Sequence, residues 1–377
     1  MSTSVSHTEL IQLLQELIAI PSFSGEEQGT ADRLAHFLIG RKLPVQRLAN
    51  NVFLRNLHFD PLKPSILLNS HHDTVKPNKG YTRSAFDPAI ENGQLFGLGS
   101  NDAGASLVCL LGAFLHFYSE AHLPFNLVWL GSAEEEISGK NGVELVLGNE
   151  SFQAYTFQHF LKNHSFDRSF AIVGEPTQMQ LAVAERGLMV IDAVASGIAG
   201  HAARAEGENA LIKALEDIQQ LRLLQFPRHS NLLGATTLNV TVMNTRNQQH
   251  NVIPDHCHFV LDVRVNEQYT FDEILDQLKA VCKCELIPRS MRLRSTCIDL
   301  QHPAVQAGIR LGKSTYGSPT TSDKALMFFP SLKMGPGDSA RSHTADEFIY
   351  LEEIEQGLQG YIGHLNETFK IIRESNG

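Results

Sequence analysis

The sequence predicts an α/β fold in which a mainly parallel central sheet is flanked by helices, with a smaller α+β domain inserted into it. The first observation is that four short apolar runs each lead into a polar or glycine-rich turn and then a helical pattern. These runs are Ile66–Leu68, Leu127–Leu130, Ala171–Val173 and Leu332–Met334. The second observation is the β-α-β-β-α-β order of the patterns between the third and fourth runs.

A dense polar cluster follows each of the four runs directly. In open α/β sheets, ligands bind beyond the carboxyl ends of the strands, so clusters that are distant in sequence are expected to meet in space. The site is therefore expected where these clusters converge: Ser70–Asp73, Ser132–Glu136, Gly174–Pro176 and Gly335–Asp338.

The middle of the chain has the pattern of a ferredoxin-like domain. We place this insert at residues 181–293, so that residues 1–180 and 294–377 form one discontinuous larger domain. Its expected elements are the strand Met189–Val194, the helix Asn209–Leu224, the strands Thr237–Val242 and Phe259–Val265, the helix Phe271–Val281 and the strand Glu285–Ile287.

Composition narrows the class of protein. The 377 residues are enough for two domains. The formal net charge is −10, and the chain has no Lys/Arg run, which argues against a nucleic-acid partner. The longest apolar run, Leu107–Tyr118, is shorter than the roughly 20 residues that cross a bilayer. The N-terminal pattern favours an amphipathic helix over a signal peptide, so we expect a cytoplasmic protein. The five scattered cysteines are expected to be reduced thiols.

His71 and Asp73 form the first candidate motif. In an extended segment both side chains point the same way, so Asp73 can hold the imidazole while His71 coordinates a metal. A surface His beside a turn Asp would give the same pattern, which makes the motif weak by itself. His72 is an alternative ligand, and we favour His71 because it shares a face with Asp73.

Two acidic segments complete the pattern. Glu134, Glu135 and Glu136 follow the second run. A solvated acidic turn would explain them, but a charge-dense strand end facing a cleft is unfavourable without cations. Asp102 lies in a segment close to G-x-G-x-x-G, with Asp where the third Gly belongs and no acidic ribose-binding residue at the right distance. A carboxylate that bridges two metals suits this position better than a phosphate site.

Together these segments resemble the dizinc family of acetylornithine deacetylase, succinyl-diaminopimelate desuccinylase, carboxypeptidase G and aminoacylase, with acetylornithine deacetylase the nearest. The match covers most of the chain in the family's order. The sequence departs from the family pattern at two positions. Ala103-Gly104 stands where many members have Lys after the bridging Asp, and the Gly that often opens the segment near Thr321–Asp323 is absent. Neither position is a metal ligand, so these differences affect the choice of subfamily and not the chemistry. The matching segments are Asn69–Val75, Gly99–Asp102, Glu135–Ile137, Ile172–Thr177, Gly335–Gly337, His343 and Asp346-Glu347.

The resemblance implies two Zn²⁺ per subunit, which Co²⁺ or Mn²⁺ can replace. It makes Glu135 the general base. It also makes His201, in Gly200–Ala202, a lid residue that reaches the active site of the other subunit, and so implies a homodimer through the lid domain. Asn251 and Arg264 resemble the lid segment that holds the substrate carboxylate, and Arg341 is a further candidate for this role. The implied ligands are His71, Asp102 and Glu175 for one zinc and Asp102, Glu136 and His343 for the other.

The expected activity is therefore metal-dependent hydrolysis of a linear amide in a small-molecule N-acyl amino acid. The nearest resemblance points to N-acetyl-L-ornithine, or another N-acetyl or N-succinyl derivative of ornithine or citrulline, in arginine biosynthesis. Succinyl-diaminopimelate desuccinylase, aminoacylase and dipeptidase are alternatives within the family. A metal-dependent phosphoesterase is disfavoured by the scarcity of Lys, Arg and glycine-rich anion cradles near the clusters. A catalytically inactive binding protein is disfavoured because every expected ligand is present.

Overall fold

The computed structural model describes residues 5–156, 169–204 and 206–375, and its contacts divide the chain into two compact units. Unit 1 comprises Met1–Val183, Ile298–Tyr316 and Ser322–Gly377, and unit 2 comprises Ala184–Cys297 and Gly317–Thr321. The inserted unit thus begins and ends within four residues of the predicted 181–293. The segment 317–321 also joins it, since the Thr321 hydroxyl donates a hydrogen bond to the Arg186 carbonyl at 3.2 Å.

Unit 1 is built on the nine-stranded sheet, in the order β1-β2-β6-β3-β7-β17-β8-β15, with β16 pairing to β8. The four predicted runs are the neighbouring strands β6, β3, β7 and β17, and all three pairs between them are parallel. The predicted α/β fold with a mainly parallel centre is therefore confirmed. The strands of this sheet are β1 (Gln46–Leu48), β2 (Asn51–Arg55), β3 (Ser65–His71), β6 (Asn126–Ser132), β7 (Phe170–Val173), β8 (Leu181–Glu185), β15 (Thr296–Cys297), β16 (Thr315–Ser318) and β17 (Ser331–Lys333).

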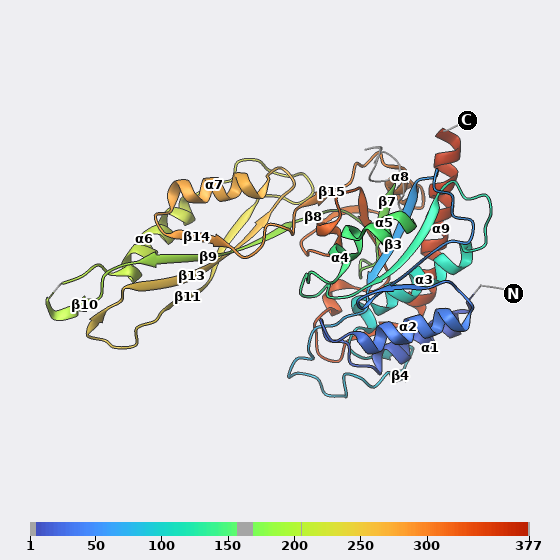
Figure 1. Cartoon of the computed structure of the whole chain (residues 1–377), viewed down its shortest axis with the longest axis horizontal. Coiled ribbons are helices and arrows are strands. Elements are labelled where there is room, and N and C mark those ends of the chain that lie inside the picture. The colour runs from blue at the N-terminus through green and yellow to red at the C-terminus, as the bar shows by residue number, and fades with distance from the viewer. Residues whose placement is uncertain (1–4, 157–168, 205, 376–377) are drawn as a thin grey trace. The chain divides into compact units, whose positions relative to one another are not determined.

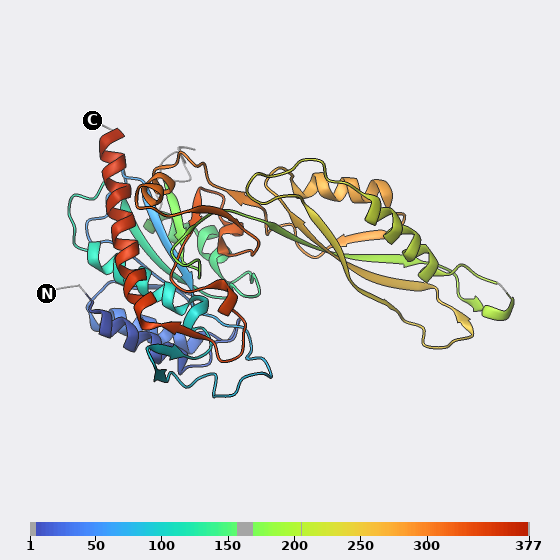
Figure 2. The same ribbon diagram turned by 180° about the vertical axis from the view of Figure 1, so that it is seen from behind.

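Helices cover both faces of this sheet (Figures 1 and 2). The buried helix α3 packs on β3 and β6, and α9 packs on α3 and α8. On the opposite face, alternate strand residues such as Leu67 and Val128 pack with Val146 of α4 and Phe152 of α5. The helices of unit 1 are α1 (His7–Ile18), α2 (Gln28–Gly40), α3 (Ala105–Phe117), α4 (Val143–Gly148), α5 (Glu150–Thr156), α8 (Pro303–Arg310) and α9 (Leu351–Ser375).

Short elements complete unit 1. A small antiparallel sheet has the order β18-β5-β4. Its strands are β4 (Ile90–Glu91), β5 (Gln94–Phe96) and β18 (Phe348–Tyr350). The short helical turns of unit 1 are η1 (Ser100–Gly104), η3 (Asp323–Leu326) and η4 (Ser339–Arg341).

The N-terminal segment forms the amphipathic helix that its pattern predicts. Ser6 and Glu9 make a reciprocal capping box at the start of α1, which satisfies two backbone N–H groups that the helix leaves free. The apolar face, including Leu10, Leu13 and Leu14, is buried. Within the described ranges 5–156, 169–204 and 206–375, no helix combines the length and apolar character needed to cross a bilayer.

Unit 2 has the predicted ferredoxin-like topology. Its four-stranded sheet runs in the order β11-β13-β9-β14, and every pair is antiparallel. The helices α6 and α7 pack against each other, and residues such as Ala214 and Leu278 share a core with Phe259 of the sheet. Its elements are β9 (Gly187–Ser196), β10 (Gly200–His201), η2 (Ala202–Arg204), α6 (Ala210–Leu223), β11 (Thr237–Thr245), β12 (Val252–Ile253), β13 (His256–Val265), α7 (Phe271–Val281) and β14 (Glu285–Pro288).

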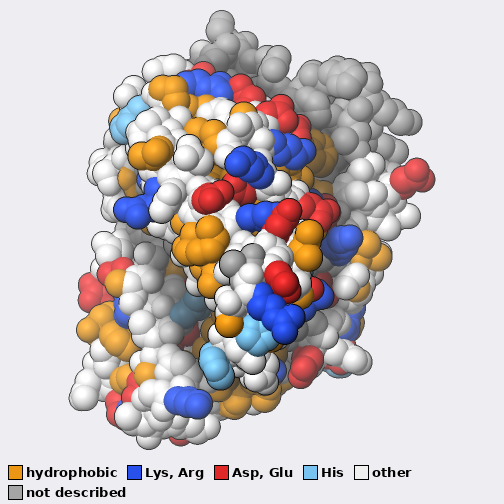
Figure 3. Space-filling model, turned by 90° about the vertical axis from the view of Figure 1, so that its left-hand side faces the viewer, with side chains coloured by type: hydrophobic (Ala, Val, Ile, Leu, Met, Phe, Trp, Pro, Cys, Tyr) orange, Lys and Arg blue, Asp and Glu red, His pale blue; other side chains and the backbone are white. Residues whose placement is uncertain are grey.

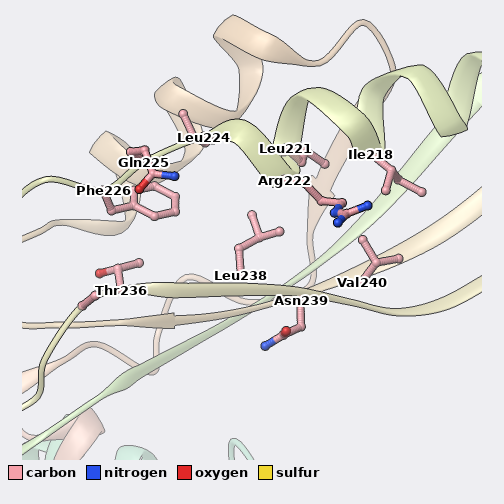
Figure 4. Close-up of a pocket in the computed structure, with 11 residues that line it drawn as sticks. Ile218, Leu221, Arg222, Leu224, Gln225, Phe226, Thr236, Leu238, Asn239 and Val240 are labelled. Carbon is pink, nitrogen blue, oxygen red and sulfur yellow. The ribbon is translucent and has the colours of Figure 1, made fainter.

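A cavity of about 470 Å³ lies between α6 and the edge strand β11 (Figure 4). Leu221 and Phe226 line it from one side and Leu238 and Val240 from the other. None of its lining residues belongs to the clusters predicted from the sequence.

On the part of the surface turned to the viewer in Figure 3, basic and acidic side chains are interspersed.

Candidate metal centre

The carboxyl ends of the parallel strands bring the predicted metal ligands of unit 1 together. His71 is the last residue of β3, Glu175 follows β7, and Glu136 follows β6. Asp102 is supplied by η1, directly before α3, and His343 by the loop after η4. Two triads result, in each of which one ligand atom per residue lies within 4.8 Å of the others: His71, Asp102 and Glu175, and Asp102, Glu136 and His343.

Asp102 belongs to both triads and offers a different oxygen to each. Its Oδ1 lies 3.4 Å from Nε2 of His71, which in turn lies 3.8 Å from Oε1 of Glu175. Its Oδ2 lies 3.7 Å from Nε2 of His343, which in turn lies 3.0 Å from Oε2 of Glu136. This is the arrangement of a carboxylate placed between two adjacent cation positions.

The ring of His71 is held so that one nitrogen faces the cluster. Its Nδ1 lies 3.0 Å from the backbone oxygen and 3.4 Å from Oδ1 of Asp73. Its Nε2 is buried and, among the residues that the structure describes, makes no hydrogen bond. Burial alone would lower the pKa of His71, but the nearby carboxylates of Asp102 and Asp73 raise it well above its usual value. The surroundings of this nitrogen therefore favour positive charge.

Asp73 braces more than the histidine. Its carboxylate accepts hydrogen bonds from the amides of Glu135 and Glu136, at 3.0 and 3.1 Å, and from the hydroxyl of Ser24 at 2.7 Å. Burial would raise the pKa of Asp73, but the contacts with His71 and Ser24 lower it overall, so the group stays ionised. One buried carboxylate thus positions a residue of each triad.

We expect Asp73→Asn to lower metal affinity or turnover by about 10- to 100-fold, the usual cost of losing such a supporting group. The amide keeps one acceptor oxygen but loses the charge that orients His71. Isothermal titration of Zn²⁺ and steady-state kinetics would measure this, with Ser24→Ala as the control that removes a single supporting bond. Equal effects of the two substitutions would contradict the role of the Asp73 charge.

His72 is turned away from both triads. Its ring lies between the hydroxyl of Thr30, at 2.8 Å from Nδ1, and the carbonyl of Asn50, at 2.9 Å from Nε2. Burial lowers the pKa of His72 to about 4, so this ring is neutral. The structure therefore brings His71, and not its neighbour, into the cluster.

Glu135 is partly buried beside the triads, and its carboxyl belongs to neither. Burial raises the pKa of Glu135 well above its usual value, and nearby Glu175 and Asp323 raise it further, despite the opposing effect of His71. Glu134 has a different environment, because its carboxylate accepts hydrogen bonds from the backbone and side-chain amides of Asn141 at 3.0 and 2.9 Å. The three consecutive acids thus have three different environments.

Two buried carboxyls beside the cluster have no role in the sequence prediction. Glu347 accepts hydrogen bonds from the amides of Asn101 and Asp102 at 2.8 and 2.9 Å, and burial raises its pKa to about 8. Asp323 accepts from the side chains of Asn69 and Ser132, at the ends of β3 and β6. Of these two residues, only Glu347 lies in a motif identified from the sequence, Asp346-Glu347.

A model of the peptidase family M20/M25/M40 matches residues 67–367 of the chain. The chain belongs to this family. Membership makes it a metal-dependent hydrolase that acts on amide bonds, as the two triads and the partly buried Glu135 suggest. The match begins in β3 and ends in α9, so it spans every predicted ligand.

Relatives of this M20-family chain are similar over nearly its whole length. It is 22% identical to a succinyl-diaminopimelate desuccinylase of Rickettsia bellii, covering 95% of this chain and 96% of the relative. It is 27% identical to a peptidase M20 domain-containing protein of Schizosaccharomyces pombe, covering 93% and 83%. The acetylornithine deacetylase resemblance is therefore established only at the level of the family.

Solved structures share the fold. Aminopeptidase PepT from Bacillus cereus superposes with a TM-score of 0.72 at 17% identity, covering 97% of this chain and 99% of the other. YXEP from Bacillus subtilis, described as a dinuclear metal binding peptidase, superposes with a TM-score of 0.70 at 16% identity, covering 97% and 98%.

The predicted substrate residues of this M20-family chain lie in varied surroundings. In unit 2, His201 is exposed, and its Nδ1 accepts from the amide of Ala203 at 3.1 Å. Arg264 on β13 pairs with Asp262 at 2.8 Å, and the carbonyl of Asn251 accepts from the amide of Ala202 at 3.0 Å. Their roles toward a substrate remain predictions.

Arg341, in unit 1, has its guanidinium engaged within the protein. It pairs with Glu353 of α9 through two nitrogens, one of them at 2.8 Å. It also lies over the rings of Phe348 and Tyr350, at 5.0 and 5.5 Å from their centroids. These contacts fasten η4 to α9, so binding a substrate carboxylate would require Arg341 to leave Glu353 or to bind a further oxygen.

Proposed function

We propose that this M20-family chain is a zinc-dependent hydrolase of N-acyl amino acids, with Glu135 as the general base. The observation that carries the proposal is the position of Asp102, whose Oδ1 faces His71 and whose Oδ2 faces His343. The Nε2 of His71 beside it is buried and makes no hydrogen bond among the described residues. Histidine and carboxylate ligands without cysteine are typical of catalytic zinc sites.

The residues fit two divalent cations. Each triad combines one His with two carboxylates, and Asp102 is common to both. The three carboxylates gathered in this partly buried cluster repel one another unless cations neutralise them, and a cation would also give Nε2 of His71 a partner. His71, Asp102 and Glu175 would hold one cation, and Asp102, Glu136 and His343 the other.

Bound there, two zinc ions would lower the pKa of a shared water molecule and polarise the substrate carbonyl. Glu135 is the group in this chain that can move the proton. It takes a proton from the attacking water and returns it to the nitrogen of the leaving amine. Burial raises the pKa of Glu135, which makes its carboxylate a stronger base toward the attacking water.

The first substrate to test is N-acetyl-L-ornithine, because the segment Gly335–Glu347 resembles acetylornithine deacetylase most closely. A second candidate is N-succinyl-diaminopimelate, which the name of the Rickettsia bellii relative favours. Incubating the zinc-loaded protein with acetylated or succinylated ornithine, citrulline and diaminopimelate, and measuring acetate and succinate separately, tests both. Turnover of none of these would remove the deacylase proposal and leave the family's peptide substrates.

The proposal includes a homodimer in which His201 serves as a hydrogen-bond donor to the developing oxyanion. We expect His201→Ala to lower kcat by about 10²–10³-fold, the usual cost of losing such a donor, while both metals stay bound. Steady-state kinetics with metal analysis checks this. A cytoplasmic location and a place in arginine biosynthesis remain predictions from the sequence.

The neighbouring lid histidine His250 offers a matched control, since it is exposed and no part of the motif. His250→Ala is expected to leave kcat and metal content unchanged. Unchanged kcat in His201→Ala would remove this residue from the mechanism, and a loss of metal in that variant would assign it a different role.

A further inference from the structure

Unit 2 contains a cluster of metal-ligating groups unconnected with the triads of unit 1. Asp217 lies on α6, while Cys282 and Cys284 lie in the connection from α7 to β14. One ligand atom from each of the three lies within 4.8 Å of the others. Figure 1 shows α6 and α7 together on one face of the four-stranded sheet, with β14 at its edge.

The backbone sets the two thiols on the same side. Cys282 ends α7 in an extended conformation, with φ −100° and ψ 139°. Residues two apart in extended chain point the same way, so Cys284 faces Cys282 across Lys283. The two thiols hydrogen-bond with each other, and both are reduced.

Asp217 is held in place as a third donor. Its side chain is buried, with 3% of the residue exposed. Its Oδ2 accepts from the amides of Lys283 and Cys284, at 3.0 and 2.7 Å, while Oδ1 accepts from the amide of Lys283, at 3.1 Å. Because a carboxylate oxygen has two lone pairs, Oδ1 keeps one available for a ligand.

The cluster also opens to solvent. A cavity of about 430 Å³ is lined by Asp217 and Cys284, and by Lys213 and Lys283. Two thiolates and a carboxylate around a divalent cation leave one excess negative charge, which Lys283 can offset, whereas Lys213 is paired with Glu208. The cavity also leaves a fourth coordination position open for water or another small ligand.

We propose that Asp217, Cys282 and Cys284 form a binding site for a thiophilic divalent cation such as Zn²⁺, in addition to the two-metal centre of unit 1. Two sulfur donors select soft or borderline cations over Mg²⁺ or Ca²⁺. A disulfide between the same cysteines would not involve the positioned carboxylate of Asp217, whereas a cation would take this carboxylate as its third ligand. Both cysteines must lose a proton to ligate, so binding releases protons.

Cd²⁺ is the probe that separates this site from the other one. Sulfur-to-cadmium charge transfer absorbs in the ultraviolet only when a thiolate ligates, and the triads of unit 1 contain no cysteine. The full-length protein, stripped by chelation and kept reduced with a phosphine, is titrated with Cd²⁺. We expect the charge-transfer absorption at saturation to correspond to one thiolate-bound Cd²⁺ per chain, and the protein to bind up to three Cd²⁺ in all, because the triads of unit 1 also take up the cation.

Four variants make the assignment specific. Cys282→Ser and Cys284→Ser are expected to lose most of the charge-transfer absorption, and Asp217→Asn to bind Cd²⁺ about ten-fold more weakly. Cys297→Ser, which removes an exposed cysteine elsewhere in unit 2, is the control and should match the wild type. Circular dichroism checks that the variants fold. If Asp217→Asn does not fold, the two conservative serine variants still test the proposal.

Three results would overturn the proposal. They are absence of the absorption in the reduced wild-type protein, its persistence in both serine variants, and its loss in Cys297→Ser alone. Mass spectrometry of air-exposed protein adds a further outcome: a Cys282–Cys284 disulfide, together with no Cd²⁺ signal after reduction, would replace the cation site by a redox pair.

Discussion

Glu135→Gln is expected to lower kcat by about 10²–10⁴-fold, the usual contribution of a positioned general acid–base, while the protein still binds two metal ions. The amide has nearly the same shape as the carboxylate but cannot take a proton from water. Because Glu135 belongs to neither triad, its replacement leaves the ligands in place. Steady-state kinetics and metal analysis on the same preparation measure the two effects separately.

The adjacent residue supplies a matched control. Glu134→Gln makes the same chemical change one position earlier, where the carboxylate bonds to Asn141 and not to the cluster. We expect it to keep near-native kcat. If Glu135→Gln retained near-native turnover, or if both variants lost activity equally, Glu135 would not be the base.

Removal of the metal ions is the second change with a large expected effect, and its consequence for stability depends on pH. Without cations, burial raises the pKa of Glu347 to about 8, and the hydrogen bond with Glu136 raises that of His343 to about 9. Burial raises the pKa of Glu135 in the same direction. At these three groups the folded metal-free protein therefore binds more protons than the unfolded chain does.

The sign follows from this proton difference. Stability falls with pH wherever the folded state holds more protons. For Glu347 the loss runs from its usual pKa of 4.5 up to about 8, and for His343 from 6.5 up to about 9. We expect the free energy of unfolding of the metal-free protein to decrease from about pH 7 to pH 9, because below about pH 6.5 the pKa values of His72, His302 and His364, which burial lowers, have the opposite effect.

Chemical denaturation at pH 5, 7 and 9, with and without Zn²⁺, tests this expectation. The gain in stability on adding Zn²⁺ should be larger at pH 7 than at pH 5, where protons already reduce the repulsion and compete for the ligands. Asp102→Ala should show little gain at any pH. A metal-free protein that became more stable between pH 7 and pH 9 would contradict the electrostatic account of the cluster.

The parallel strands and their ends could be predicted because they depend on local patterns. The apolar runs that become β6, β3, β7 and β17 are short, end in polar clusters and leave room for crossover helices, which is enough to specify a parallel sheet. Once the sheet forms, its geometry brings His71, Glu136 and Glu175 together. The ferredoxin-like order of unit 2 is likewise set by alternation along β9, β11 and β13.

Other features depend on contacts that no local pattern records. The segment 317–321 joins unit 2 through pairing with residues far away in sequence. Asp323 supports the ends of β3 and β6 from a separate loop, so its spacing from Asn69 carries no information. The isolated Arg341 looked available for a substrate, whereas Glu353, one turn into α9, engages it. Cys282 and Cys284 gain their third donor only when α6 packs beside α7.

The central claim is that five side chains of unit 1 hold two divalent cations through a shared Asp102. The most direct measurement is the number of zinc ions per chain after equilibrium dialysis. It compares the wild type, Glu135→Gln and Asp102→Ala. All three proteins carry Cys282→Ser and Cys284→Ser, which excludes the site in unit 2. The account predicts two ions in the first two proteins and fewer than one in Asp102→Ala. Two ions retained in Asp102→Ala, or none in the wild type, would contradict it.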